Sequence, residues 1–312
     1  MSDNIIKLQS LPWTGERYIT EVKGNIELEH LHRYLFAKQL SLGERVLDIA
    51  SGEGYGSALL AQSAASVVGV DIAAEAVAHA KAKYRANNLE YRLGSCAAIP
   101  LDSHSVDVVV SFETIEHHSE HEAMMREVKR VLIPGGLLII SSPDKLEYSD
   151  RPSYDNPYHI KELYRGEFKS LLDSYFENHR MAGQRIIYGS VIFSEDGDTN
   201  ISSYELSDKS LQAVPGVSRA LYLVAVASDG ELPLTESGVL EQPIEESDMV
   251  RGQIASFNQS MAERDAQIAS RDAQIANLNG QLTVLLQSTS WRVTRPLRFI
   301  KGLYAPLTKL IF

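Results

Sequence analysis

The sequence predicts an α/β protein in which a parallel sheet is covered by helices on both faces, followed by a long C-terminal helix. Two patterns lead to this expectation. Short β-branched runs alternate with helical stretches from Arg45 onward, and apolar residues recur at every seventh position beyond about Val250. The first pattern is typical of buried parallel strands joined by helices, and the second is typical of a coiled coil.

Five strands and three helices can be placed in the core. Each strand is a short apolar run, and each helix follows a short connection, as α/β units require. The expected strands are 45–49, 66–71, 90–93, 106–111 and 137–142, and the expected helices are 56–64, 74–87 and 120–131. Two later apolar runs, 185–193 and 220–227, are expected to form an antiparallel pair at one sheet edge.

Further segments lie on either side of this core. Residues 26–40 carry leucines at helical spacing and should pack over the sheet as a helix, whereas the acidic, proline-containing stretch after Ser228 reads as a linker. The expected division of the chain is a cap or lid at 1–44, a core domain at 45–228, a linker at 229–249, a coiled coil at 250–287 and a basic amphipathic tail at 288–312.

The predicted coiled coil has an irregular seam. Its a positions are Ile254, Met261, Ile268, Ile275 and Leu282, and its apolar d positions are Phe257, Leu278 and Leu285. Arg264 and Arg271 also fall at d, which weakens the middle of the seam. A lone surface helix is the alternative, but it would leave the apolar stripe without a packing partner. We therefore expect a homo-oligomer.

Charge separates an acidic body from a basic tail. The chain of 312 residues has a formal net charge of −11, yet 288–312 contains five basic residues, Arg292, Arg295, Arg298, Lys301 and Lys309, and no acidic one. The acidic body argues against nucleic acid as a partner. The tail combines cations with aromatic and aliphatic residues, which is typical of an interfacial membrane anchor, although a helix packed on a partner subunit would have a similar composition.

The number of cysteines and the hydropathy of the chain indicate its cellular compartment. A single cysteine, Cys96, excludes an intramolecular disulfide framework, and no signal-peptide pattern opens the chain. No apolar run reaches the roughly 18 to 20 residues that a bilayer requires. We expect a cytoplasmic protein, with any membrane contact peripheral and at the inner face of the cytoplasmic membrane.

A glycine-rich turn follows the first strand. The segment Asp48-Ile-Ala-Ser-Gly-Glu-Gly-Tyr-Gly56 leads from that strand into a helix, where glycine lets the backbone approach a nucleotide-type cofactor. Asp71 ends the second strand about 20 residues later, where a carboxylate can accept both ribose hydroxyls. Ser95 to Ala97 end the third strand and would border an adenine ring. A nicotinamide-dependent enzyme would share the first two features.

Three segments together resemble successive motifs of class I S-adenosylmethionine-dependent methyltransferases: Val46–Gly56, Gly69–Ile72 and Glu127–Gly136, which ends in Pro-Gly-Gly. The resemblance implies a Rossmann-like seven-stranded sheet and S-adenosylmethionine as cofactor. The residues it assigns to the cofactor are Asp48, Ala50, Gly52, Gly54, Tyr55, Asp71, Ile72, Ser95, Cys96, Ala97 and Phe112. Ala50 stands where glycine is usual, which a negative φ would tolerate, and Ser95 stands where an acidic residue is frequent.

The segment after the fourth strand carries candidate catalytic groups. Glu113, Glu116 and His117 are spaced so that one helical turn would present them together. His117, with Glu113, could act as general base on an attacking hydroxyl, or the three could bind a divalent metal. The turn could instead only shape the cofactor pocket or cap backbone groups.

A second resemblance bears on the metal. The Glu-Thr-Ile-Glu-His pattern, with Ser142-Pro-Asp144 and Tyr158-His159 downstream, is similar to metal-dependent small-RNA 2′-O-methyltransferases and some quinone O-methyltransferases. It implies Mg²⁺ or another divalent ion on Glu113, Glu116, His117 and His159.

The N-terminal segments Thr14–Tyr18 and His30–Tyr34 are expected to form a lid over the cofactor. In the alternative, Arg17 and Arg33 make surface ion pairs with Glu16 and Glu29. These segments and the Ser288–Arg298 tail resemble methyltransferases and glycosyltransferases of bacterial surface-polysaccharide synthesis. The resemblance implies a sugar hydroxyl of a lipid-linked, O-antigen-like glycan as acceptor, with glycosyltransferases as partners. A small aromatic or quinone acceptor, or an inert assembly factor, are the alternatives.

Overall fold

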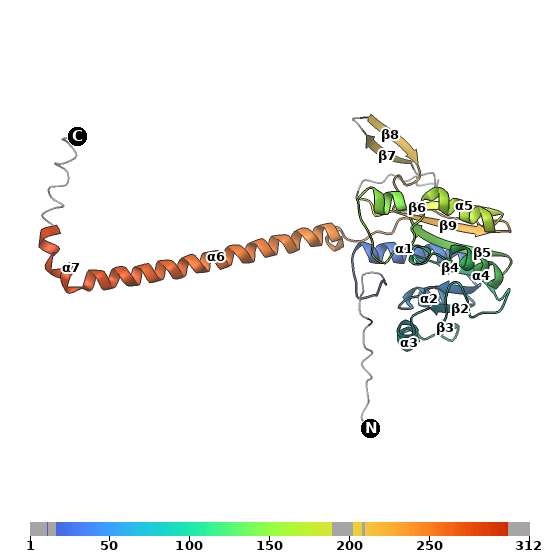
Figure 1. Ribbon diagram of the computed structural model, residues 1–312, viewed down its shortest axis with the longest axis horizontal. Coiled ribbons are helices and arrows are strands. Elements are labelled where there is room, and N and C mark those ends of the chain that lie inside the picture. Colours follow the sequence, from blue (N-terminus) through green and yellow to red (C-terminus); the bar gives the residue numbers. More distant parts are fainter. Residues whose placement is uncertain (1–10, 12–16, 189–201, 208–209, 299–312) are drawn as a thin grey trace, which may run out of the picture. The chain divides into compact units, whose positions relative to one another are not determined.

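A seven-stranded mixed sheet is the centre of the first of two units in this chain (Figure 1). The computed structural model describes residues 11, 17–188, 202–207 and 210–298. The first unit is Met1–Glu246 and the second is Ser247–Phe312. The strands of the sheet are β1 Arg45–Ile49, β2 Ser66–Asp71, β3 Leu89–Leu93, β4 Val106–Ser111, β5 Leu132–Pro143, β6 Asn178–Gln184 and β9 Tyr222–Ser228.

The strand order is β3-β2-β1-β4-β5-β9-β6. The first five of these strands are parallel, and β9 lies antiparallel between β5 and β6. This arrangement confirms the expected Rossmann-like seven-stranded sheet. The chain order reverses direction across the sheet between β1 and β4, which is where ligands bind in open α/β sheets.

Helices cover both faces because residues alternate along each strand. On β4, Val109 faces a core shared with α4 and α5, whereas Val108 and Val110 face a second core shared with α1 and α2. Such continuous apolar runs are typical of strands buried on both sides. The helices of the first unit are α1 Asn25–Leu40, α2 Tyr55–Leu60, α3 Ala74–Lys83, α4 His121–Val131 and α5 Arg165–Tyr175.

Several smaller elements complete the first unit. A 3₁₀ turn at Ile115–His117 follows β4, and a π-type turn at Leu146–Asp150 follows β5. Strands β7 Ser202–Ser207 and β8 Ser210–Pro215 pair as a separate antiparallel ribbon, and a second 3₁₀ turn lies at Ile244–Glu246.

One predicted strand is wrong. An antiparallel pair at the sheet edge was expected from 185–193 and 220–227; the second run is β9, but the edge strand that pairs with it is Asn178–Gln184. Residues 185–188 lie in no strand, and 189–193 are outside the described residues. The edge strand is polar because neither of its faces is fully buried, so its sequence lacks the apolar run that marks an inner strand.

The second unit consists of helices α6 Asp248–Gln287 and α7 Thr289–Val293 in its described part. Ser247 begins α6 as its N-cap, since its side chain accepts a hydrogen bond from the backbone N–H of Val250. Ser288 separates the two helices and caps α7 in the same way. Among the described helices of the chain, none combines the length and the apolar character needed to span a membrane.

Candidate active site

The glycine turn between β1 and α2 has a left-handed backbone at three positions. The φ angles are +57° at Ala50, +57° at Gly52 and +96° at Gly54. A Cβ atom on Gly54 would lie 2.7 Å from Cβ of Ala80, so no side chain fits there. Ala50 therefore does not have the negative φ that its side chain favours. A left-handed alanine costs about 1 kcal/mol, which the surrounding turn offsets.

Asp48 is fully buried at the end of β1 and is hydrogen-bonded within the protein. Its carboxylate accepts a hydrogen bond from Oη of Tyr34 at 3.0 Å and from Oγ of Ser57 at 2.6 Å. Burial raises the pKa of Asp48 to about 7, although the two hydrogen bonds oppose this shift. The Tyr34 ring packs directly on Gly56, where a Cβ would lie 2.0 Å from Cζ of the ring. Asp48 thus fixes α1 and α2 against the turn.

Asp71 ties the end of β2 to the glycine turn. One carboxylate oxygen accepts from the backbone N–H of Gly52 at 2.8 Å, and the other accepts from the N–H of Ala73 at 2.9 Å. Nη2 of Arg17 lies 3.8 Å from the second oxygen. The next side chain, Ile72, is 75% exposed. A fixed carboxylate and an exposed apolar group therefore lie side by side at this strand end.

The turn after β3 contains the predicted adenine-side residues. Oγ of Ser95 accepts a hydrogen bond from the N–H of Ala97 at 3.1 Å. Sγ of Cys96 lies 3.5 Å from Nε2 of His118, and burial raises the pKa of the thiol. Cys96 thereby connects this turn to the segment that follows β4.

Aromatic side chains join the cap to the same edge of the sheet. Tyr34 makes edge-to-face contacts with Tyr55, at 5.2 Å between ring centroids, and with Phe112, also at 5.2 Å. Nδ1 of His30 lies 3.0 Å from Oη of Tyr55, and the His30 ring stacks on Tyr18. Residues Thr14–Glu16 of the expected lid lie outside the described residues.

A buried carboxylate in the glycine turn was missed by the sequence analysis. Glu53 forms an ion pair with Lys83 and accepts hydrogen bonds from the N–H of Thr20 at 3.2 Å and from Oη of Tyr84 at 3.1 Å. It therefore links the N-terminal segment, the turn and α3. The sequence contained one signal for this contact. An acidic residue stands inside the glycine-rich turn, and α3 ends in basic residues.

Glu113 does not share the 3₁₀ turn that carries Glu116 and His117. Its backbone is left-handed, with φ of +49°, and Oε1 accepts a hydrogen bond from Oγ of Ser141 at 2.5 Å. The 3₁₀ turn begins only at Ile115. The expectation that one helical turn presents Glu113, Glu116 and His117 together is therefore wrong, because the bend at Glu113 directs its carboxylate toward the end of β5.

Arg33 of the cap is buried rather than exposed. Its Nη1 donates to Oε1 of Gln184 at 2.7 Å and lies 4.0 Å from Oε1 of Glu113. The guanidinium also lies over the Tyr222 ring, 4.8 Å from its centroid. The alternative of a surface pair between Arg33 and Glu29 is therefore wrong for this arginine. Arg33 lies in the predicted lid segment His30–Tyr34, but its buried contacts with Gln184 and Glu113 were not predicted from the sequence.

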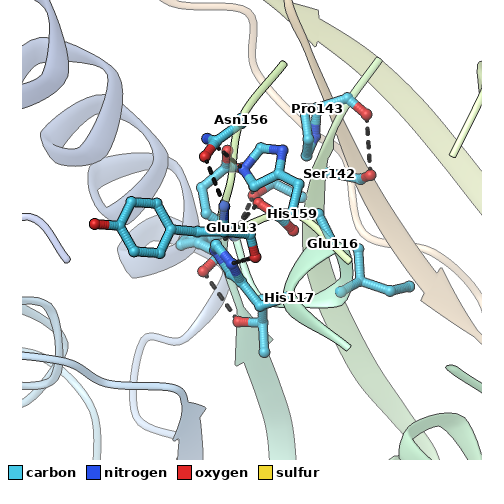
Figure 2. A network of polar contacts seen from close by, with 12 residues as sticks. Glu113, Glu116, His117, Ser142, Pro143, Asn156 and His159 are labelled. Atoms are coloured by element: carbon cyan, nitrogen blue, oxygen red, sulfur yellow. Dashed lines mark hydrogen bonds and ion pairs between the residues drawn. The ribbon is translucent and has the colours of Figure 1, made fainter. Parts of the chain in front are cut away.

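Glu116, His117 and His159 come together after β4 (Figure 2). One potential ligand atom from each lies within 4.8 Å of the other two. Nε2 of His117 is 3.9 Å from Oε1 of Glu116, and the two imidazole rings are 5.1 Å apart. The backbone carbonyl of Glu116 accepts from the N–H of Ile160 at 2.8 Å, which holds the His159 segment against the turn. Three of the four predicted metal-site residues are thus adjacent, and Glu113 is not.

Neighbouring groups orient both imidazoles. Nδ1 of His117 lies 3.2 Å from the carbonyl oxygen of Tyr158, so it carries the proton of that hydrogen bond. Nδ1 of His159 is 2.5 Å from Oε1 of Glu162, and its Nε2 is 3.0 Å from the side-chain nitrogen of Asn156. The contact between Nδ1 of His117 and Tyr158 leaves Nε2 of His117 directed toward Glu116. A nitrogen lone pair facing a carboxylate can hold a proton or a cation between them.

Known proteins match this chain over its sheet. Residues 47–140 match the family model described as "Methyltransferase domain". Over these residues the chain therefore resembles a methyltransferase domain. Two relatives, described below, are named as S-adenosylmethionine-dependent. The matched segment of the methyltransferase domain runs from β1 through most of β5, and so includes the glycine turn, Asp71 and the Glu116–His117 turn.

Three known proteins are similar to this chain over part of its length. Proteins of Mycolicibacterium smegmatis and Mycobacterium tuberculosis, each described as a "probable S-adenosylmethionine-dependent methyltransferase", are 36% and 38% identical over 168 and 180 residues. These alignments cover 53% and 55% of this chain and 65% and 64% of the relatives, slightly less than two thirds. A fatty-acid O-methyltransferase of M. smegmatis is 29% identical over 37% of this chain and 40% of its own length.

Proposed function

We propose that this protein transfers the methyl group of S-adenosylmethionine to a hydroxyl of an acceptor molecule. The observation that carries the proposal is the single edge of the sheet at which the glycine turn, Asp71 and the Glu116–His117 turn follow neighbouring strands. This edge supplies a cofactor cradle and a proton acceptor together. The matched relatives extend beyond the aligned segment, so the activity of the whole chain is part of the proposal.

The cofactor would lie across the ends of β1, β2 and β3. Asp71 would accept the ribose hydroxyls, because each of its oxygens has a lone pair beyond the one used by a backbone N–H. The exposed side chain of Ile72 would pack against the adenine ring, with Ser95 to Ala97 on its other border. Asp48 would support the methionine end indirectly, through the turn that it fixes.

Two buried hydroxyls fit a polar ligand at this edge. Oγ of Ser51, in the glycine turn, and Oγ of Ser111, at the end of β4, are buried and have no hydrogen-bond partner among the described residues. Buried polar groups are normally satisfied, so such atoms indicate a missing partner. The amino and carboxylate groups of the methionine part of the cofactor could supply one for each.

His117 is the proposed general base. The acceptor oxygen would attack the methyl carbon, the carbon–sulfur bond would break, and the hydroxyl proton would pass to Nε2 of His117. Nδ1 of His117 donates a hydrogen bond to the carbonyl oxygen of Tyr158, so Nε2 is the unprotonated nitrogen of the neutral ring, as the proposed base requires. Glu116, 3.9 Å away, would stabilise the imidazolium that forms.

A divalent cation is a second candidate for activating the hydroxyl, favoured by the adjacency of Glu116, His117 and His159. Two imidazoles and one carboxylate suit zinc, iron or nickel better than Mg²⁺, which prefers oxygen ligands. The contact from His159 to Glu162 is the kind that orients metal-binding histidines. Ligation through Nε2 of His159 would require the Asn156 amide to turn away. A bound cation would acidify the acceptor hydroxyl.

A sugar hydroxyl of a lipid-linked surface polysaccharide is the acceptor we favour, with glycosyltransferases as partners. Support comes from the resemblance of the N-terminal and C-terminal segments to proteins of that kind of pathway. A small aromatic or lipid acceptor is the alternative, supported by the fatty-acid O-methyltransferase among the relatives. The tail would hold the enzyme at the membrane surface, since Arg292, Arg295 and Arg298 follow Trp291 within seven residues. The part of the tail beyond Arg298 is outside the described residues.

Two measurements test the proposal. Calorimetric titration of the full chain with S-adenosylmethionine should detect one site, and Asp71→Ala should weaken it at least tenfold. Lys169→Ala, on the exposed side of α5, serves as the control and should leave the affinity unchanged. Mass spectrometry of surface polysaccharide from cells with and without the gene should then detect a methyl group lost with the gene. Absence of cofactor binding by the unaltered chain would end the proposal.

A further inference from the structure

Helix α6 carries an apolar stripe that no described residue of its own chain covers. The helix has 40 residues, none of them buried. Its large apolar side chains are about half exposed, among them Ile254, Ile268, Ile275, Leu278, Leu282 and Leu285. They repeat at the a and d positions of a heptad, so they lie along one seam of the helix. A seam with this period fits another helix of the same period.

Two arginines interrupt the seam. Arg264 and Arg271 occupy d positions, and each is followed directly by an aspartate, Asp265 and Asp272, at the flanking e position. Neither arginine has an acidic residue three or four positions away, where a side chain on the same helix could pair with it. Among the described residues, none of these four side chains forms an ion pair within its own chain. The charges are thus arranged for a partner outside the helix.

The direction of the partner helix decides what each arginine meets. In a parallel pair, a d side chain packs beside the e residue of the facing helix, and in an antiparallel pair it packs beside the g residue. The e residues here are Asp265 and Asp272, whereas the neighbouring g residues are Gln267 and Gln274. Only the parallel, in-register alignment places each arginine against an opposite charge.

The chemistry of the seam also bears on the number of strands. Isoleucine occupies a in the middle of the helix, and leucine occupies d in its C-terminal part, a combination that favours two strands. In a two-stranded coil the d position lies near solvent, so an arginine can extend to the edge of the seam. A third helix would enclose the same guanidinium and increase its desolvation cost.

We infer that α6 pairs with α6 of a second copy of this chain as a parallel, in-register, two-stranded coiled coil. Arg264 and Arg271 of one chain pair with Asp265 and Asp272 of the partner subunit. The duplicated Arg-Asp-Ala-Gln-Ile-Ala segment provides the pair twice, which fixes both direction and register. Because parallel helices end together, both basic tails leave the dimer at the same end. This inference is independent of the proposed catalytic activity.

Association is tested on the full chain by light scattering coupled to size-exclusion chromatography. The expected mass is that of two chains. Ile268→Asp at an a position should yield monomers, whereas Ala266→Asp, on the far side of the helix at f, should leave the dimer intact. A monomeric unaltered chain, or a mass of three chains, would overturn the inference.

Direction is tested by exchanging the charges. The double variants Arg264→Asp/Arg271→Asp and Asp265→Arg/Asp272→Arg should each raise the dimer Kd at least tenfold. Combining all four substitutions should return Kd to within about threefold of the unaltered value, because the pairs re-form with reversed sign. An antiparallel dimer has no such compensation, so additive losses in the fourfold variant would overturn the parallel alignment.

A crosslink provides a second measure of direction. In a Cys96→Ser background, Leu278→Cys places a thiol at d, where identical residues of parallel helices face each other. Mild oxidation should give a disulfide-linked dimer, and Asn277→Cys at the outward c position should not. In an antiparallel dimer Leu278 would lie opposite Met261 of the partner subunit. Crosslinking only in a mixture of Met261→Cys and Leu278→Cys chains would therefore contradict the inference.

Discussion

Tyr34 donates a hydrogen bond to Asp48 across the interface between α1 and the end of β1, with 3.0 Å between Oη and the nearer carboxylate oxygen. Both groups are buried, and the tyrosine ring fills the space that a side chain on Gly56 would need. A residue of the cap thus determines the conformation of the glycine turn. The cap therefore supports the proposed cofactor site as well as covering the sheet.

Replacement of this tyrosine should therefore destabilise the fold and the turn together. Tyr34→Phe leaves Asp48 with Ser57 as its only side-chain donor, and the loss of one hydrogen bond to a buried carboxylate costs about 1 to 3 kcal/mol. Urea unfolding measures this loss. Tyr175→Phe, which removes an exposed hydroxyl contact, is the matched control and should cost less than about 0.5 kcal/mol. Equal effects of the two changes would contradict the role of Tyr34.

The raised pKa of Asp48 predicts a pH dependence of stability. Asp48 titrates near pH 7 in the folded chain but near its ordinary value of 3.8 when unfolded. Between these values the folded state holds one more proton than the unfolded state, so stability decreases as pH rises, by up to about 1.4 kcal/mol per pH unit. Above pH 7 this contribution is constant. Asp48→Asn should remove the slope, which unfolding curves for both proteins from pH 4.5 to 8 would measure. If the stability of the two proteins changed with pH by the same amount, the predicted contribution of Asp48 would be refuted.

The inner strands could be predicted from sequence because burial on both faces leaves a clear apolar signal. β1, β2 and β4 begin and end at the predicted residues. The edge strand β6 was missed, since its residues alternate between partly buried and exposed and its pairing comes from the backbone of β9. For such a strand, tertiary contacts decide the structure and local composition does not.

The candidate site was predicted in its residue types but only in part in its geometry. The resemblance to metal-dependent O-methyltransferases placed His159 with Glu116 and His117, which the structure brings together. Spacing alone could not separate Glu113 from this group, because that depends on a left-handed backbone at a non-glycine residue. The buried pairing of Arg33 with Gln184 joins residues far apart in the sequence, for which a single sequence carries no signal.

The left-handed φ at Ala50 makes this position a candidate for stabilisation. Ala50→Gly should raise the free energy of unfolding by about 0.5 to 1 kcal/mol, because glycine relieves the backbone strain by more than it adds unfolded-state entropy. Ala58→Gly, inside α2, should have the opposite sign and a similar magnitude. Denaturant titration of both variants measures the difference. If both substitutions destabilise equally, Ala50 is not strained.

Metal binding at the predicted site should depend on Glu116, His117 and His159 and not on Glu113. If a cation binds at this site, titration with Zn²⁺ monitored by calorimetry should detect it in the unaltered chain and lose it in His117→Ala and in His159→Ala. Glu113→Gln should leave the affinity within about twofold, since its carboxylate is hydrogen-bonded to Ser141 instead. Loss of binding in the Glu113 variant would show that the carboxylate moves into the site. Absence of binding in the unaltered chain would leave His117 as a metal-free base.

The different contacts of Glu113 and His117 predict different kinetic effects for the two residues. His117→Ala should lower kcat by about 10²- to 10⁴-fold and leave the affinity for S-adenosylmethionine within about twofold, because the role proposed for the imidazole is to accept the proton of the acceptor hydroxyl. Glu113→Gln should change kcat much less, since this carboxylate contacts Ser141 and lies beside Arg33. Methyl transfer to polysaccharide from a strain lacking the gene measures both. A His117→Ala enzyme that retains more than a tenth of kcat would assign proton removal to another group.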